Sequence, residues 1–150
     1  MSSEAHAQIE EIVHRETRAW NTQDVELLLS SFHPDMVWPW PPHQDAHDPA
    51  LWVWGMGRFH LERWRAVYRE LFDSHTLVHN CREIVRIDVS PEGDGALAVV
   101  DVDTLWRSHS GVEQNWKGRA GKVYAKLGDE WKMTMHTGLL RYDVASLAKH

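Results

Sequence analysis

The sequence has a single cysteine, Cys81, among 150 residues, which excludes an internal disulfide and a zinc site built from cysteines. Long apolar runs are also missing near the N-terminus. Charged residues recur every few positions from Glu4 to Arg18, a pattern that fits neither a signal peptide nor a membrane span. We therefore expect a cytoplasmic protein with no membrane partner.

Acidic residues outnumber basic residues in this sequence. Lys and Arg total 16 against 22 Asp and Glu, and the formal net charge is -6 at pH 7. Such a surface repels a phosphate backbone, and no basic cluster is interleaved with aromatic residues. Nucleic acid is therefore not an expected partner.

Phenylalanine and tyrosine are scarce, with three of each, whereas nine tryptophans and eleven histidines are present. Residues 37–55, VWPWPPHQDAHDPALWVWG, hold four of the tryptophans together with four prolines. Proline at this density excludes a regular helix and allows strand pairing only at a sheet edge, so we expect a loop. Each indole also brings an N–H group that needs a partner when it is buried.

The order of periodic segments predicts one domain with an α+β fold. Apolar spacing near 3.6 residues indicates helices over 4–21, from Val25 to before Pro34, and over 57–72, with a brief strand over 35–38. Four runs of strand-forming residues follow, separated by turn formers: 76–90, 95–109, 115–127 and 130–143. Three N-terminal helices followed by a meander predict helices packed on one face of a mostly antiparallel sheet.

Three stretches resemble conserved parts of one superfamily: RAWNTQDVELLLSSFHPDMVW (18–38), VWGMGRFHLERW (53–64) and KVYAKLGDEWKM (122–133). They are similar to the nuclear transport factor 2-like superfamily, which includes ketosteroid isomerase and the SnoaL-type polyketide cyclases. The resemblance implies a strongly curved sheet that forms a cone with the helices and encloses an internal pocket. It also implies that Lys122 faces that cavity.

The resemblance does not extend to the chemistry of ketosteroid isomerase. The general base of that enzyme aligns at or near Trp38, where this chain has no acid. Its tyrosine in the first helix aligns near Glu16. We therefore do not transfer its catalytic residues to this chain.

Tryptophans are the predicted pocket lining. A proline-stiffened loop between the first strand and the third helix would lie at the rim of the cone, where its indoles could form a lid. The alternative is that these indoles contact a neighbouring subunit, because large apolar patches mark interfaces. The predicted substrate-binding residues are Trp38, Trp40, Trp52, Trp54, Trp64, Trp116 and Tyr124.

Acid–base chemistry has four candidate residues: His60, Asp101, Lys122 and His136. Asp101 and Asp103 share one face of a strand, which either lines the pocket as a coupled carboxylate pair or faces solvent. Strict alternation puts His136 on the face opposite Trp131 and Met133. A histidine of ordinary pKa, about 6.5, suits proton transfer, whereas a histidine in the middle of a strand is more often a structural group.

A metal site is the weaker hypothesis. His43 and His47 have the i, i+4 spacing of helical metal ligands, but the neighbouring prolines leave little room for a helix. A third ligand would have to come from His60 or His75. We therefore expect neither a metal nor a cofactor.

The expected function is that of a small-molecule-binding SnoaL-like protein that forms a homodimer. As an enzyme it would be a cofactor-independent isomerase, dehydratase or cyclase acting on a small apolar or aromatic substrate. His60 or His136 would be the base, and Lys122 or Asp101 would stabilise the developing charge. The alternative is a non-catalytic ligand-binding or oligomerisation domain.

Overall fold

The computed structural model describes residues 2–39, 53–54 and 56–138. These residues form three helices and five strands in an α+β arrangement, as the sequence predicts. Their bounds are α1 (Ser2–Thr22), α2 (Val25–Leu29), β1 (Phe32–Val37), α3 (Leu61–Ser74), β2 (His75–Val89), β3 (Gly95–Ser108), β4 (Glu113–Leu127) and β5 (Glu130–Gly138).

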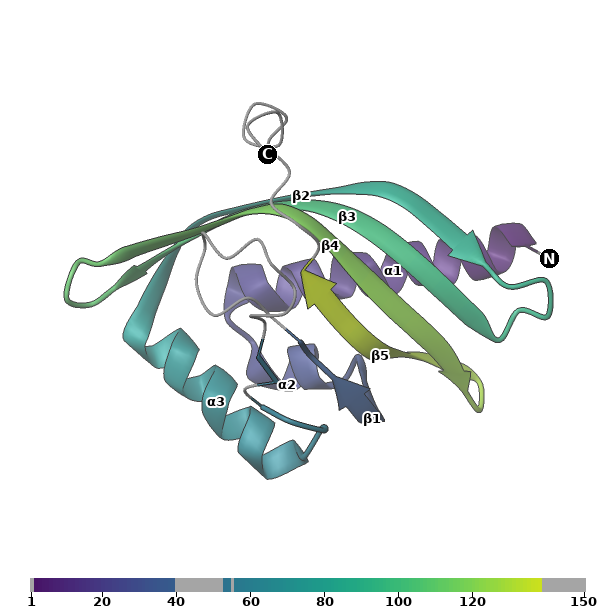
Figure 1. The fold of residues 1–150 in the computed structure, drawn as a ribbon, viewed down its shortest axis with the longest axis horizontal. Coiled ribbons are helices and arrows are strands. Elements are labelled where there is room, and N and C mark those ends of the chain that lie inside the picture. The colour runs from purple at the N-terminus through teal and green to yellow at the C-terminus, as the bar shows by residue number, and fades with distance from the viewer. Residues whose placement is uncertain (1, 40–52, 55, 139–150) are drawn as a thin grey trace.

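The strands form one open, mixed sheet in the order β1-β5-β4-β3-β2. Strands β2 to β5 are an antiparallel meander, whereas β1 pairs with β5 in parallel. Pro34 lies in β1 at the edge of the sheet. Proline has no backbone N–H group, and at an edge strand its absence need not interrupt the hydrogen bonds between strands. The long strands are strongly bent, and the sheet arches over the helices (Figure 1). The predicted cone is confirmed.

Helix α1 supplies one apolar stripe to the core. Ile9, Ile12, Val13 and Trp20 are buried and recur at helical spacing, so this side of the helix faces the sheet. The stripe also carries a charged residue, Glu16, whose exposed fraction is 0%.

Side-chain caps mark where the shorter helices begin. Asp24 accepts a hydrogen bond from the backbone N–H of Leu27 at 3.0 Å and starts α2. His60 Nδ1 accepts from the N–H of Arg63 at 3.2 Å and starts α3. The third helix therefore begins four residues later than the predicted 57, because Gly57 has a φ of 64°, outside the helical region.

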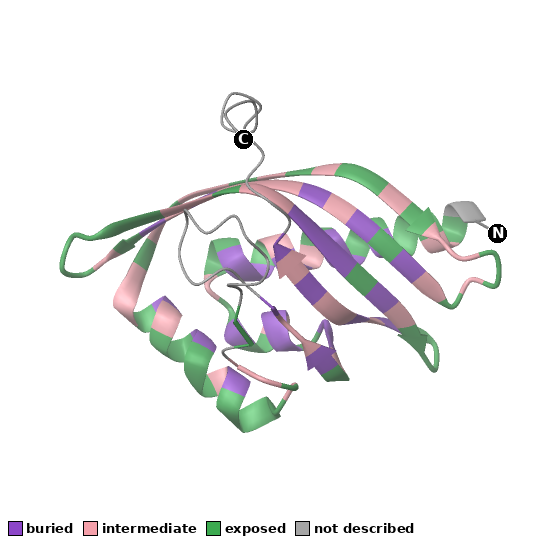
Figure 2. Ribbon diagram, in the orientation of Figure 1, coloured by how far each residue is buried: buried purple, intermediate pink, exposed green. Residues whose placement is uncertain are grey.

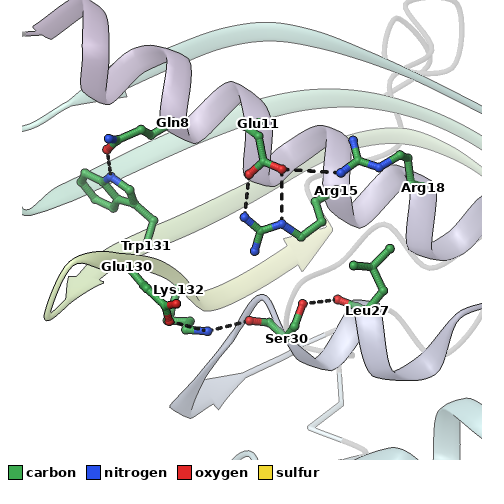
Figure 3. Close-up of polar contacts among 9 residues, drawn as sticks. All are labelled: Gln8, Glu11, Arg15, Arg18, Leu27, Ser30, Glu130, Trp131 and Lys132. Atoms are coloured by element: carbon green, nitrogen blue, oxygen red, sulfur yellow. Dashed lines mark hydrogen bonds and ion pairs between the residues drawn. The ribbon is translucent and has the colours of Figure 1, made fainter.

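Polar contacts join α1 and the turn after α2 to β5 (Figure 3). Trp131 Nε1 donates to Gln8 Oε1 at 2.8 Å, and Lys132 Nζ donates to the carbonyl of Ser30 at 2.7 Å. These contacts hold α1 and the residue that ends α2 against β5.

Burial alternates along the strands, so the sheet has a buried inner face and a more exposed outer face (Figure 2). On β3 the buried positions are Ala96, Ala98, Val100, Thr104 and Trp106. No helix among the described residues is long and apolar enough to cross a membrane.

Candidate functional site

A pocket of about 370 Å³ lies on the inner face of the sheet, between the strands and helices α1 and α3. This volume is in the range of small-molecule sites, roughly 300–1,000 Å³. Four of its lining residues are tryptophans, and polar groups are few. The lining consists of Trp20, Trp38, Val53, Met56, Val67, Tyr68, Leu71, Arg82, Val102, Thr104, Trp106, Trp116 and His136.

Aromatic rings in edge-to-face contact form one wall of the pocket. The ring centroid of Trp20 lies 5.6 Å from that of Tyr68 and 6.2 Å from that of Trp106. Trp38 stacks on the imidazole of His136 at 3.8 Å, with the two planes 12° apart. Each contact restrains the orientation of both rings, so the wall is shaped before any ligand enters.

A β-bulge in β5 brings His136 into the pocket. Met133 pairs with Tyr124 and Met135 pairs with Val123, so Thr134 is the extra residue between them. The bulge reverses the alternation, and His136 therefore shares the inner face with Met133. The prediction that His136 lies opposite Trp131 and Met133 is wrong for this reason.

A second bulge turns Arg82 inward. Leu77 pairs with Trp106 and His79 pairs with Leu105, which leaves Val78 unpaired in β2. From Asn80 to Ile84 the even-numbered positions of β2 therefore face inward, until a further bulge at Val85 reverses the alternation again. Arg82 thus reaches the pocket with only 9% of its side chain exposed.

Beneath the pocket, one carboxylate is shared by two cations. Glu16 Oε1 accepts from Lys122 Nζ at 2.6 Å, and its Oε2 accepts from Arg82 Nη1 at 2.9 Å. The same Oε2 accepts from Trp20 Nε1 at 2.8 Å. Glu16 and Lys122 are both 0% exposed, so these contacts replace water entirely.

The buried cluster stays charged at neutral pH. Burial raises the pKa of Glu16, but the attraction of Lys122 and Arg82 outweighs it and holds the pKa far below its usual 4.5. Burial lowers the pKa of Lys122 to about 8, although Glu16 opposes that change. At pH 7 the cluster therefore contains one negative and two positive charges.

Two neutral groups complete the polar part of the pocket. Burial, reinforced by the charge of Lys122, lowers the pKa of His136 well below 6.5, so its imidazole is neutral at pH 7. Burial and the charge of Glu16 raise the pKa of Tyr68, which keeps its hydroxyl protonated. A neutral imidazole can accept a proton, and a neutral phenol can donate a hydrogen bond to an oxygen anion.

Comparison with known proteins identifies the family. A family model for the SnoaL-like domain matches residues 1–137. The chain belongs to the SnoaL-like family. The superfamily resemblance seen in the sequence is therefore confirmed, and family and fold together support a small-molecule-binding domain. A search of curated proteins finds no match for it.

Solved structures share the fold at low identity. A ketosteroid isomerase-like protein from Erwinia carotovora atroseptica SCRI1043 is 16% identical, with 90% of this chain and 95% of that chain covered and a TM-score of 0.67. A nuclear transport factor 2-like protein of unknown function from Pseudomonas putida KT2440 is 18% identical, with 97% and 93% covered and a TM-score of 0.63. At these identities the likeness shows the fold alone.

The SnoaL-like domain brings three of the predicted site residues together. Trp38, Trp116 and His136 all line the pocket. Lys122 pairs directly with His136 across the sheet and lies on the inner face, but its ammonium group is bound to Glu16 and it does not line the pocket.

Other predicted residues lie apart from the pocket lining. His60 is exposed and caps α3, and Trp54 is 55% exposed. Trp64 is fully buried, and its Nε1 donates to the carbonyl of Met56 at 3.0 Å. Tyr124 is buried in the core.

The carboxylates of β3 lie on the outer face, because Val102 and Thr104 between and beside them line the pocket. Asp101 forms an ion pair with Arg119 at 2.7 Å. Asp103 accepts from Asn115 at 2.9 Å. The two carboxylates are thus held by separate partners on the side of the sheet away from the pocket.

Some sequence expectations lie outside the described residues: those for Trp40, Trp52, His43 and His47. Among residues 2–39, 53–54 and 56–138, no three His, Cys, Asp or Glu side chains gather in a way that could hold a metal ion.

Sequence reasoning missed Arg82, Tyr68 and the role of Glu16. A signal for Glu16 was present, since it falls on the apolar stripe of α1, where a charge needs a buried partner. Arg82 gave no comparable signal, because its inward direction depends on the bulge at Val78.

Replacing the shared carboxylate should destabilise the domain more than replacing one of its cations. Glu16→Gln leaves Arg82 and Lys122 buried without an anion, and we expect it to lower the free energy of unfolding by about 3 kcal/mol or more. Lys122→Met leaves Glu16 paired with Arg82, so its loss should be smaller, about 1–2 kcal/mol. Urea unfolding at pH 7 measures both.

Glu11→Gln is the matched control for Glu16→Gln on the same helix. Glu11 pairs with Arg15 at the exposed surface, so its replacement should change the free energy of unfolding by less than about 0.5 kcal/mol. A loss in Lys122→Met equal to or larger than that in Glu16→Gln would contradict the shared-carboxylate account.

Proposed function

We propose that this protein binds a small, largely apolar or aromatic molecule in the inner-face pocket and acts on it as a cofactor-free lyase, isomerase or cyclase. The observation that carries the proposal is a preformed aromatic pocket that holds a neutral imidazole, His136, beside hydrogen-bond donors. Trp20, Trp38 and Trp116 offer flat apolar surface for the ligand.

General acid–base catalysis is the chemistry that these groups support. His136 is neutral at pH 7 and would remove a proton from carbon beside a carbonyl group, then return it at a second position. Tyr68, kept protonated, would donate to the oxygen on which negative charge develops. Lys122 stays 0% exposed on Glu16 and acts through the field that it creates at His136.

A second candidate is a non-catalytic ligand-binding or oligomerisation domain. The outer face of the sheet favours an assembly role, since Val85, Leu97 and Val123 are 47%, 40% and 36% exposed there. Leu97 and Val123 are also cross-strand neighbours and form a continuous apolar area. We propose that this face joins two copies of the chain in a homodimer.

Ligand binding should quench tryptophan fluorescence. A library of small aromatic ketones, phenols and acids, with 2-tetralone as the first probe, should contain compounds that quench wild type. Val102→Phe places a ring in the pocket and should weaken their binding roughly tenfold or more. Val112→Phe, in the turn between β3 and β4 and outside the pocket lining, is the control and should bind as wild type does. Equal quenching in both variants would remove the pocket from the proposal.

Proton abstraction should depend on His136. For an enolisable ketone that binds, such as 2-tetralone, ¹H NMR in D₂O measures exchange of the protons beside the carbonyl. We expect His136→Asn to slow catalysed exchange by roughly 10²–10⁴-fold, and His14→Asn, at an exposed site on α1, to leave it unchanged. Because the pKa of His136 is lowered, the wild-type rate should stay level from pH 8 down through 6.5 and fall only at lower pH. Exchange that persists in His136→Asn favours the non-catalytic alternative.

The homodimer can be tested by sedimentation equilibrium. Wild type should sediment as a dimer, and Leu97→Lys combined with Val123→Lys should shift it to a monomer with an unchanged circular dichroism spectrum. Val112→Lys changes a more exposed apolar residue, 62% exposed and in the turn between β3 and β4, and should leave the dimer intact. A monomeric wild type contradicts this assembly.

A further inference from the structure

We infer that the pocket is an anion receptor and that its ligand is a carboxylate attached to an aromatic or other flat apolar ring, bound through the guanidinium of Arg82. The inference rests on the proposed ligand-binding function and specifies the chemical class of the ligand. It does not require that the ligand be turned over.

The buried charges beneath the pocket do not balance. Glu16 is the one carboxylate that contacts Lys122 and Arg82 among the described residues, so the cluster carries a net positive charge of one. Both oxygens of Glu16 are already occupied by three donors, the two cations and Trp20. A buried excess charge is costly unless an opposite charge approaches, and an anionic ligand in the pocket provides it.

The guanidinium of Arg82 is held in place and retains donor capacity. Its Nε donates to Asn80 Oδ1 at 2.9 Å, and its Nη1 donates to Glu16. Asn80 is itself fixed by Thr104, whose hydroxyl donates to the same Oδ1 at 2.7 Å. No described residue accepts from Nη2, so this N–H edge can bind a ligand oxygen without rearrangement.

A second donor is available on the facing helix. Tyr68 lines the pocket, and its hydroxyl is buried and has no hydrogen-bond partner among the described residues. A buried hydroxyl without a partner is unfavourable, and an acceptor on the ligand would satisfy it. Arg82 and Tyr68 together supply donors to a carboxylate, which only accepts.

The remainder of the pocket selects for an apolar ring. Apart from Arg82, no charged side chain of the described residues lines it, since His136 is neutral at pH 7. Trp20, Trp106 and Trp116 provide flat walls, and a volume of about 370 Å³ accommodates a bicyclic ring. A cationic ligand would be repelled by Arg82, and a neutral one would leave the positive charge uncompensated.

Two probes of nearly the same shape, one charged and one neutral, separate the contribution of charge to the binding affinity from the contribution of shape. Isothermal titration calorimetry at pH 7 compares 2-naphthoate with its neutral amide, naphthalene-2-carboxamide. We expect wild type to bind 2-naphthoate roughly ten- to a hundredfold more tightly, as for a hydrogen bond to a charged partner. Val102→Phe should weaken both compounds and so place them in the pocket.

Arg82→Gln should abolish the preference for the carboxylate, and Arg82→Lys should retain part of it. Arg86→Gln is the matched control, since Arg86 lies on the same strand, is 72% exposed and pairs with Asp88. It should preserve the full preference. Because the two probes are first compared on wild type, the test holds even where an Arg82 variant does not fold.

The outcomes distinguish this inference from the function on which it rests. If wild type binds the amide as tightly as 2-naphthoate and Val102→Phe weakens both, the anion receptor is refuted while the small-molecule pocket stands. The anion receptor is likewise refuted, and the pocket retained, if Arg82→Gln folds and keeps the preference for the carboxylate. If Val102→Phe leaves the binding of both compounds unchanged, or neither binds to wild type, the inference is refuted together with the proposed pocket.

Discussion

The structure depends on one buried carboxylate that serves two cations. Glu16 binds Lys122 across 106 residues of sequence and also binds Arg82, so α1 is joined to β4 and β2 at once. A buried ion pair adds little to the free energy of unfolding compared with apolar side chains packed in the same space. It does require a precise arrangement of the two side chains, because a buried charge that loses its partner is strongly destabilising. The cluster therefore specifies where the first helix lies on the sheet.

This constraint also shapes the pocket above it. Trp20 donates to Glu16 and at the same time forms part of the aromatic wall, so the wall and the charge cluster share one residue. Arg82 likewise contacts Glu16 on one edge and lines the pocket. The field of Lys122 and the burial of His136 keep the imidazole neutral. Shape, charge and proton affinity of the site thus come from the same few contacts.

Much of the fold could be predicted from the sequence, because helices and strands have different periods of apolar residues. The stripe of Ile9, Ile12 and Trp20 indicated α1, and the β-rich runs with Gly-containing turns indicated the meander. The ends of elements were less accurate: α3 begins at a cap, His60, which local spacing does not reveal. Trp38 and Trp116 line the pocket, whereas Trp54 and Trp64 share the residue type but not the location.

The sequence by itself determined the α+β class, the apolar faces and the surplus of indoles, because these follow from composition and local periodicity. Only the tertiary structure decided which polar groups meet. The bulges at Val78 and Thr134 reverse strict alternation and turn Arg82 and His136 to the inner face. A bulge arises from the register between two strands, and the pairing of Glu16 with Lys122 arises from a helix crossing a sheet. Neither is a property of neighbouring residues, so neither could be read from local pattern.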